Sequence, residues 1–173
     1  KRKNKNYFEL VLKEMLVEYY SQADEALKAL RQTGYGKMYN NALEHKNLNH
    51  GSYNHHNIVL LNGKIAMINM SKINYAPAIQ DVYDYLRKVM EKYHWKQKTG
   101  QNILEAYESV RQLKPDEREY LCLRLAYPEK FWKTASAYSR SNKAWLPEKS
   151  VEKLQTAVEQ TKEKEVFLRE VFE

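Results

Sequence analysis

The sequence predicts a mostly helical α+β fold, in which one small β-hairpin is set into a body of helices. Apolar residues recur at three- and four-residue steps on both sides of residue 60, as on amphipathic helices. Residues 57–61 and 64–68 are short apolar runs, and Asn62-Gly63 between them favours the positive φ angles of a type I′ turn. A proline followed by an acid occurs at residues 115, 128 and 147, a pattern typical of helix starts.

The helices can be placed in order from these patterns. The expected helices cover residues 7–31, 37–46, 79–93 and 100–112, with three more beginning at Pro115, Pro128 and Pro147. Gly34 and Gly36 are expected to end the first helix. The helix that begins at Pro147 is expected to continue past Leu168.

Length and composition indicate one folded domain over residues 1–173, with 43% apolar and 29% charged residues. No apolar run is long enough to cross a membrane, and the basic start, Lys1 to Asn6, lacks the apolar stretch of a signal peptide. Cys122 is the single cysteine, which excludes an internal disulfide and suits a reducing compartment. Its leucine-rich surroundings predict a buried thiol.

The formal net charge is +7, which would suit an acidic partner such as nucleic acid. The basic residues are spread along the chain, however, and lysine alternates with glutamate near the C-terminus as on a solvated helix face. No strands carry the alternating aromatic and basic side chains of an RNA-binding sheet. A basic helical nucleic-acid binder is therefore a distant alternative.

The most informative segment runs from His50-Gly51-Ser52 through Asn57 and the hairpin to Ile68-Asn69. This layout resembles the catalytic and metal loops of kinase-like phosphotransferases, His-Gly-Asp-x-x-x-x-Asn, then a short strand pair, then Ile-Asp-Phe-Asp. The resemblance gives Ser52 the position of the catalytic base and Asn69 that of a metal-binding aspartate. Asn57 occupies the position of the metal-binding asparagine.

Two of these replacements remove charge that phosphoryl transfer needs. A serine hydroxyl at position 52 does not ionise near neutral pH and is a poor proton acceptor. Magnesium prefers carboxylate and phosphate oxygens to the neutral amide of Asn69. We therefore expect no catalytic residue: His50 is a loop anchor, Asn57 and Asn69 are vestigial metal or nucleotide positions, and ATP and Mg²⁺ would bind only if activity remained.

Other chemistry at this segment is less well supported. Four histidines lie near the loop, at His45, His50, His55 and His56. Their spacing fits no helix face, and no cysteine or acidic pair accompanies them, so we expect no metal site. A nucleophilic Ser52 would need a partnered base and a nucleophile elbow. Asp81 and Asp84 are the remaining acids close to this region in sequence, and for both we expect a structural role.

Several segments resemble the CotS family of bacterial spore coat proteins. They are residues 6–36, 81–95, 103–113, 127–133 and 141–147, of which Pro-Glu-Lys-Phe-Trp-Lys is the most specific piece. That family is similar to aminoglycoside phosphotransferases and choline kinases. The resemblance implies a two-lobed kinase-like fold, of which this chain corresponds to the larger, helical C-terminal lobe. The N-terminal lobe, with its phosphate-gripping loop and lysine, is absent from the chain.

The resemblance also implies a role. We expect a spore coat-associated protein with a degenerate kinase-like domain, made in the mother-cell cytoplasm, that acts in coat assembly with other coat proteins. Its many tyrosines and lysines would suit an adhesive or cross-linkable surface. The main alternative is a small-molecule phosphotransferase with an atypical site, because loose phosphoryl transition states depend more on positioning than on a base.

Overall fold

The computed structural model of the chain describes residues 2–141 and 147–172, and the prediction of a mostly helical α+β fold is confirmed. Its helices are α1 (Arg2–Gln32), α2 (Tyr35–Glu44), α3 (Ile79–Lys92), α4 (Gln97–Glu108), α5 (Pro115–Ala126), α6 (Glu129–Ser139), α7 (Glu148–Glu159) and α8 (Thr161–Phe172). Within the described ranges, no helix combines the length and the apolar character that crossing a membrane requires.

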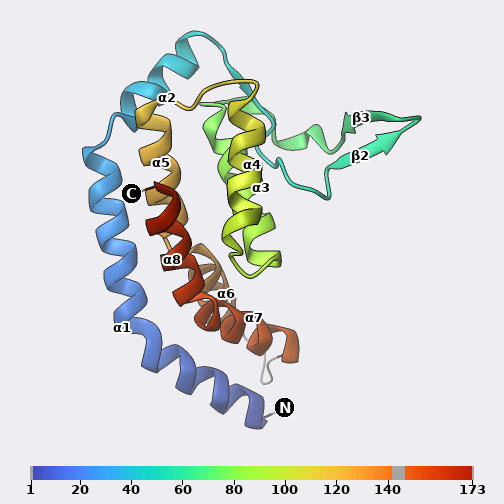
Figure 1. Cartoon of the computed structure of the whole chain (residues 1–173). Coiled ribbons are helices and arrows are strands. Elements are labelled where there is room, and N and C mark those ends of the chain that lie inside the picture. Colours follow the sequence, from blue (N-terminus) through green and yellow to red (C-terminus); the bar gives the residue numbers. More distant parts are fainter. Residues whose placement is uncertain (1, 142–146, 173) are drawn as a thin grey trace.

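Helix α1 runs along one side of the body and packs against α5 and α7 (Figure 1). Helix α5 also contacts α3 and α8, and α4 packs against both α3 and α8. Two groups of buried side chains hold this arrangement. The larger group joins α3, α4, α5 and α8 around Tyr83, Leu86, Leu121 and Phe167. The smaller group joins α1, α6 and α7 around Phe8, Phe131 and Leu154.

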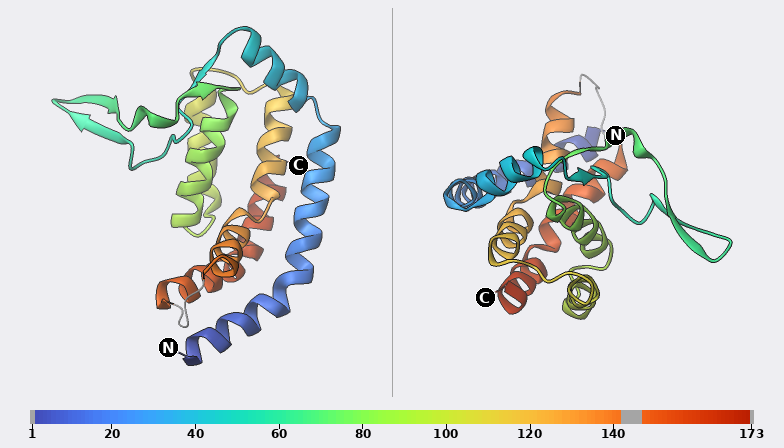
Figure 2. Two further views of the ribbon diagram at one scale, coloured as in Figure 1. Left: turned by 180° about the vertical axis from the view of Figure 1, so that it is seen from behind. Right: turned by 90° about the horizontal axis from the view of Figure 1, so that it is seen from above.

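The strands form two antiparallel pairs. Strand β2 (Ile58–Leu61) pairs with β3 (Lys64–Met67) as predicted, with positive φ angles at both turn residues, Asn62 and Gly63. This hairpin projects away from the helical body in both views of Figure 2. A second pair, β1 (Leu48–Asn49) with β4 (Asn74–Tyr75), was not predicted, because two residues are too few to show a strand pattern. A 3₁₀ turn, η1 (Met70–Lys72), lies between β3 and β4.

Four local predictions were wrong. The helix expected over residues 100–112 begins at Gln97 and ends at Glu108. Gly36 lies inside α2 instead of ending α1, since Thr33 and Gly34 already separate the two helices. The last helix is interrupted at Gln160, whose buried side-chain amide donates to the carbonyl of Glu91, 3.2 Å away on α3. Cys122 is half-buried rather than buried.

A buried ionic cluster joins α3 to the start of α6. Arg87 is 6% exposed and pairs with Glu91 at 2.8 Å and with Glu129 at 3.6 Å. Glu129 also pairs with Arg124 at 3.7 Å and accepts a hydrogen bond from the Tyr83 hydroxyl. Burial alone would raise the pKa of Glu129, but the charge of Arg87, the hydrogen-bonded ammonium of Lys133 and the Tyr83 hydroxyl together lower it to about 2.

The lowered pKa of Glu129 predicts an acid-sensitive contribution to stability. Because the carboxylate is held ionised in the folded state, its contribution is complete above the unfolded pKa of 4.5 and is lost as the pH falls toward 2. We expect Glu129→Gln to be less stable at neutral pH and to lack this part of the acid loss. Urea unfolding from pH 7 to 2 measures it, with the exposed Glu119→Gln as the control. Parallel pH profiles for wild type and Glu129→Gln would contradict the assignment.

A close contact between α4 and α8 predicts a second effect. A Cβ atom on Gly100 would lie 2.2 Å from a ring carbon of the fully buried Phe167. Gly100→Ala should therefore destabilise the fold by about 1–3 kcal/mol, because the packed ring cannot yield. Gly36→Ala in α2 meets no atom within 4 Å and serves as the control; it should be neutral or stabilising by up to about 1 kcal/mol. Equal unfolding midpoints for the two variants would contradict this packing.

Candidate functional site

The loop between β1 and β2 is fastened to α3 by one carboxylate. Asp81, in the first turn of α3, accepts the backbone N–H of His50 at 2.7 Å and that of Gly51 at 3.0 Å. The side chain of Asn49 holds the loop as well. Its Oδ1 also accepts the Gly51 N–H, and its Nδ2 donates to the carbonyl of Pro77 at 3.0 Å. The sequence did not single out Asn49, although its place directly before the His-Gly pair was the available signal.

Gly51 allows the loop between β1 and β2 to approach the backbone of η1 closely. Its φ angle is +69°, which other residues rarely adopt. A Cβ atom at this position would lie 2.2 Å from the carbonyl oxygen of Lys72. Glycine is therefore required here both by the backbone conformation and by the close contact.

Both ring nitrogens of His50 are used within the site. Nδ1 lies 3.2 Å from the backbone N–H of Ser52 and accepts it, so the ring proton is on Nε2, which donates to the carbonyl of Ile68 at 3.0 Å. The side chain is 6% exposed. This arrangement ties the loop to Ile68, the residue after β3. It also leaves the ring no free nitrogen that could activate the Ser52 hydroxyl.

Ser52 and Asn57 are brought into direct contact. The Asn57 amide donates to the Ser52 carbonyl at 2.7 Å and lies 3.4 Å from the Ser52 hydroxyl. The Asn54 amide donates to the same carbonyl at 2.8 Å. Ser52 and Asn57, two of the three positions identified from the spacing, are therefore in contact. Both are neutral, and they are hydrogen-bonded to each other.

Asn69 lies beside this loop through the backbone. The N–H of Ile68 donates to the carbonyl of Asn57 at 3.0 Å, which continues the β2–β3 ladder to the residue before Asn69. Asn69 adopts the left-handed conformation, with φ 64° and ψ 56°, and precedes η1. Its side-chain carbonyl accepts the Ser71 hydroxyl at 3.2 Å. The hairpin thus sets the two loops side by side, as the spacing predicted.

The other histidines and Asp84 make separate contacts. His45 contacts the carbonyl of Asn41 at 2.9 Å, while His55 and His56, in the loop itself, have ring centroids 4.0 Å apart with the rings tilted by 39°. Burial, followed by the charge of His56, lowers the pKa of His55. Burial raises the pKa of Asp84, which lines a separate pocket with Tyr83. Within residues 2–141 and 147–172, no three His, Cys, Asp or Glu side chains gather as a metal site would require.

The loop's dependence on Asp81 gives a direct prediction. In Asp81→Asn an NH₂ group would replace one of the two carboxylate oxygens that accept the N–H groups of His50 and Gly51. One of these N–H donors would then face another donor. The expected cost is about 1–3 kcal/mol of unfolding free energy. Asp84→Asn, on the same helix, is the control and should cost less, because burial already disfavours that charge. Urea unfolding compares the two variants, and an equal or larger loss in Asp84→Asn would overturn the assigned role of Asp81.

Comparison with solved structures places the fold. The chain is similar to an aminoglycoside phosphotransferase from Alicyclobacillus acidocaldarius subsp. acidocaldarius DSM 446, with a TM-score of 0.83 and 19% sequence identity. The match covers 94% of this chain and 48% of the solved chain, so this chain spans about half the length of that protein. At this identity the similarity establishes the kinase-like fold alone. No curated protein sequence matches the chain.

The family model described as "Spore coat putative kinase YutH" matches residues 1–171. The match spans nearly the entire chain, including the His50–Asn57 loop, the hairpin and the helices that hold them. It agrees with the spore coat resemblance of the separate segments and with the kinase-like fold of the solved neighbour. The chain therefore belongs to the family of spore coat kinase-like proteins that this model describes.

Proposed function

We propose that this chain is a degenerate kinase-like lobe of a spore coat-associated protein, and that it acts by binding other coat proteins rather than by transferring phosphate. One observation carries the proposal. The positions of the catalytic base and of a metal-binding aspartate hold two neutral residues, Ser52 and Asn69, in two loops that the β2–β3 hairpin sets side by side.

The contacts around these two residues support a loss of catalysis. The Ser52 carbonyl already accepts the amides of Asn54 and Asn57, and the Asn69 carbonyl accepts the Ser71 hydroxyl. Asp81, the acid that holds the loop, already uses both of its carboxylate oxygens to accept backbone N–H groups. A magnesium ion carrying nucleotide phosphates would find neutral amides where it prefers carboxylates.

The coat assignment draws on the family description, which names the spore coat. The expected location is thus the coat, and the expected partners are other coat proteins. Five tyrosines are exposed in a position to meet them: Tyr7, Tyr20, Tyr39, Tyr75 and Tyr93. The projecting hairpin adds exposed apolar side chains at Leu60 and Ile65, 72% and 77% exposed, which favour contact with a further surface.

A small-molecule phosphotransferase remains the second candidate. The family description contains the word kinase, and the hydrogen bond from Ile68 to Asn57 keeps the two loops in register despite the changed residues. This candidate requires another acid to hold magnesium and another group to accept the substrate proton.

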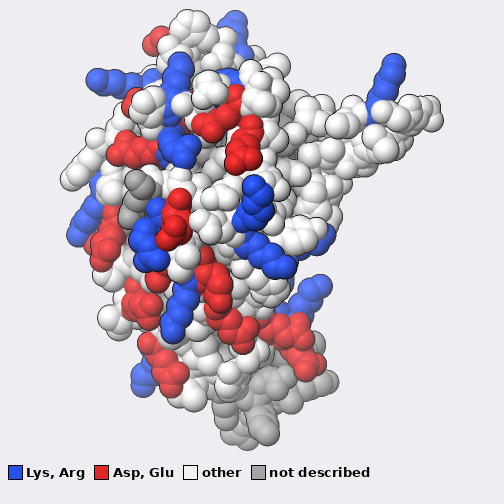
Figure 3. Space-filling view, in the orientation of Figure 1, with Lys and Arg blue, Asp and Glu red and all other residues white. Residues whose placement is uncertain are grey.

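Nucleic-acid binding ranks well below both. On the face shown in Figure 3, lysine and arginine are interspersed with aspartate and glutamate over the helices. Such mixing lowers the field that a phosphate backbone would meet.

Nucleotide binding separates the first two candidates. Thermal unfolding of the full-length protein with ATP should show no shift that depends on magnesium. The double variant Ser52→Asp/Asn69→Asp supplies the two missing carboxylates at positions whose backbone an aspartate can adopt, and it should gain a magnesium-dependent shift. Asn41→Asp, exposed on α2 and outside both loops, is the control and should gain none. A magnesium-dependent shift in the wild-type protein would favour the phosphotransferase instead.

Coat association has its own test. Proteins extracted from purified spore coats and identified by mass spectrometry should include this chain. Its absence from coats, with detection in the mother-cell fraction, would contradict the coat role whatever the nucleotide result.

A further inference from the structure

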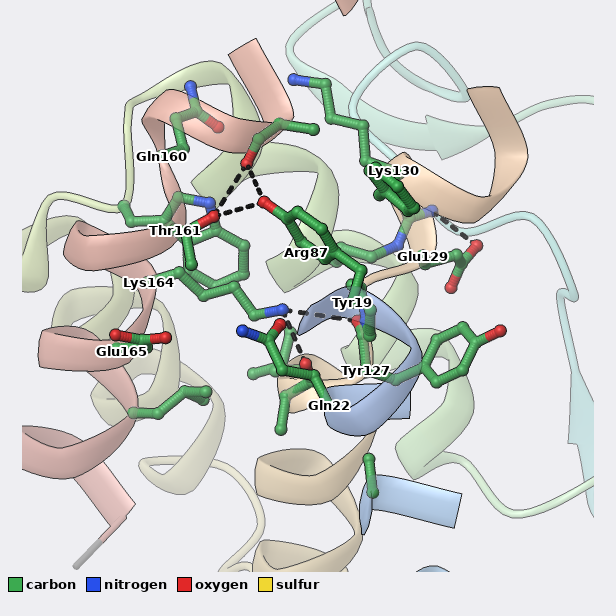
Figure 4. Close-up of a pocket in the computed structure, with 18 of the residues that line it drawn as sticks. Tyr19, Gln22, Arg87, Tyr127, Glu129, Lys130, Gln160, Thr161, Lys164 and Glu165 are labelled. Atoms are coloured by element: carbon green, nitrogen blue, oxygen red, sulfur yellow. Dashed lines mark hydrogen bonds and ion pairs between the residues drawn. The ribbon is translucent and has the colours of Figure 1, made fainter. Parts of the chain in front are cut away.

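A cavity of about 340 Å³ lies away from the catalytic-type loop, where α1, α3, α6 and α8 meet (Figure 4). None of the loop residues from His50 to Asn57 lines it, and neither does Asn69. Its volume is at the lower end of the roughly 300–1,000 Å³ typical of small-molecule sites. The cavity exists because α1 presents small side chains, Ala26 and Ala29, to the opposing helices.

The walls are largely apolar. They include Trp95, Leu123, Leu125, Phe131 and Leu168. Trp95 and Phe131 are 6% and 1% exposed and pack against Phe167 and Tyr19, so both rings are held in place by their neighbours. A ligand here would place an apolar body against two rigid aromatic walls.

Most polar groups of the cavity already have partners. The Tyr19 hydroxyl lies 2.5 Å from the Thr161 hydroxyl and donates to the Ala157 carbonyl at 3.3 Å. The Gln160 amide bonds the carbonyl of Glu91 at 3.2 Å and lies 3.1 Å from His94 Nδ1. These groups rigidify the wall but offer a ligand little free hydrogen-bonding capacity.

Lys164, unlike these groups, keeps free hydrogen-bonding capacity. Its side chain reaches from α8 toward the junction of α5 and α6, where the ammonium donates to the carbonyls of Ala126 at 2.8 Å and Tyr127 at 3.4 Å (Figure 4). The ammonium also lies 5.8 Å from the Trp95 ring centroid. Among the described residues no carboxylate makes an ion pair with it, so two carbonyls account for two of its three N–H groups.

The other charged groups of the cavity do not neutralise this ammonium. They are Glu25, Arg87, Glu91, Glu129, Lys130 and Glu165. Glu91 and Glu129 are paired with Arg87, whereas Glu25 and Glu165 are exposed. Burial lowers the pKa of Lys164 to about 8, although Glu91 and Glu165 act in the opposite direction. Burial lowers the pKa of Lys130 as well. The lining as a whole thus carries four carboxylates and three cations, but among the described residues none of these carboxylates forms an ion pair with Lys164.

We propose that this cavity binds a small carboxylate with an apolar body, whose carboxylate accepts the free N–H of Lys164 and whose body packs against Trp95 and Phe131. The carboxylate would supply the anion that the buried ammonium lacks, and a charge-assisted hydrogen bond in apolar surroundings is strong. This site is separate from the catalytic-type loop and does not depend on the proposed coat function.

Benzoate is a suitable probe, and benzamide is its neutral counterpart of similar shape. Titration calorimetry with the full-length protein should show saturable benzoate binding and roughly tenfold weaker benzamide binding, a difference of one charged contact. Lys164→Met keeps the length and apolar stem of the side chain and should lose the preference for benzoate. Lys162→Met, exposed on the same helix, is the matched control and should retain it.

Proton uptake provides a second measurement that needs no variant. Because a bound carboxylate stabilises the ammonium, the pKa of Lys164 should rise from about 8, and benzoate binding at pH 8 should take up a fraction of a proton. Calorimetry in two buffers of different ionisation enthalpy detects it. Equal affinities for benzoate and benzamide, absence of binding, unchanged binding in a folded Lys164→Met, or binding without proton uptake would each overturn the proposal.

Discussion

The arrangement of the site depends on one carboxylate receiving two neighbouring backbone N–H groups. Asp81 sits in the first turn of α3, and α3 is packed into the helical body through Tyr83 and Leu86. The loop therefore takes its position from the core and not from its own short strands. Once His50 and Gly51 are fixed, the imidazole can bridge to Ile68, and Ser52 is presented to Asn57. A charged acceptor is well suited to this task, because bonds from N–H groups to a carboxylate are stronger than those to a neutral oxygen.

The same geometry shows which residues shape the site and which occupy the positions of phosphotransfer chemistry. The groups that shape the loop are Asp81, Gly51 and the His50 ring, and none of them occupies the position of the base or of the metal-binding aspartate. Ser52 and Asn69 contribute local hydrogen bonds but hold no other element in place. Replacing an aspartate at either position therefore removes negative charge while leaving the scaffold intact. This separation underlies our proposal that the lobe works through its surface.

The sequence predicted the features that local patterns encode. Asn62-Gly63 specified the hairpin, Pro115 and the acids after it specified a helix start, and the spacing from Ser52 to Asn57 and Asn69 specified which loops meet. Features that arise from contacts between distant segments were missed. The β1–β4 pair has two residues per strand, and the break at Gln160 depends on a hydrogen bond to α3. The cavity around Lys164 requires α1, α6 and α8 to be in place before any residue identifies it.

Gly51 and Asp81 shape the loop, whereas positions 52 and 69 are those of the phosphotransfer aspartates. This separation affects how such proteins can be found in genomes. A genome search that requires the two aspartates of the phosphotransfer reaction would miss this chain, because positions 52 and 69 hold serine and asparagine instead. A search for the residues that shape the loop would recover it: a glycine with positive φ packed against a carbonyl oxygen, and an aspartate in the first turn of the following α-helix that accepts the glycine N–H. The residues that shape the loop are therefore a guide to the fold, and the residues at positions 52 and 69 are a separate guide to the chemistry.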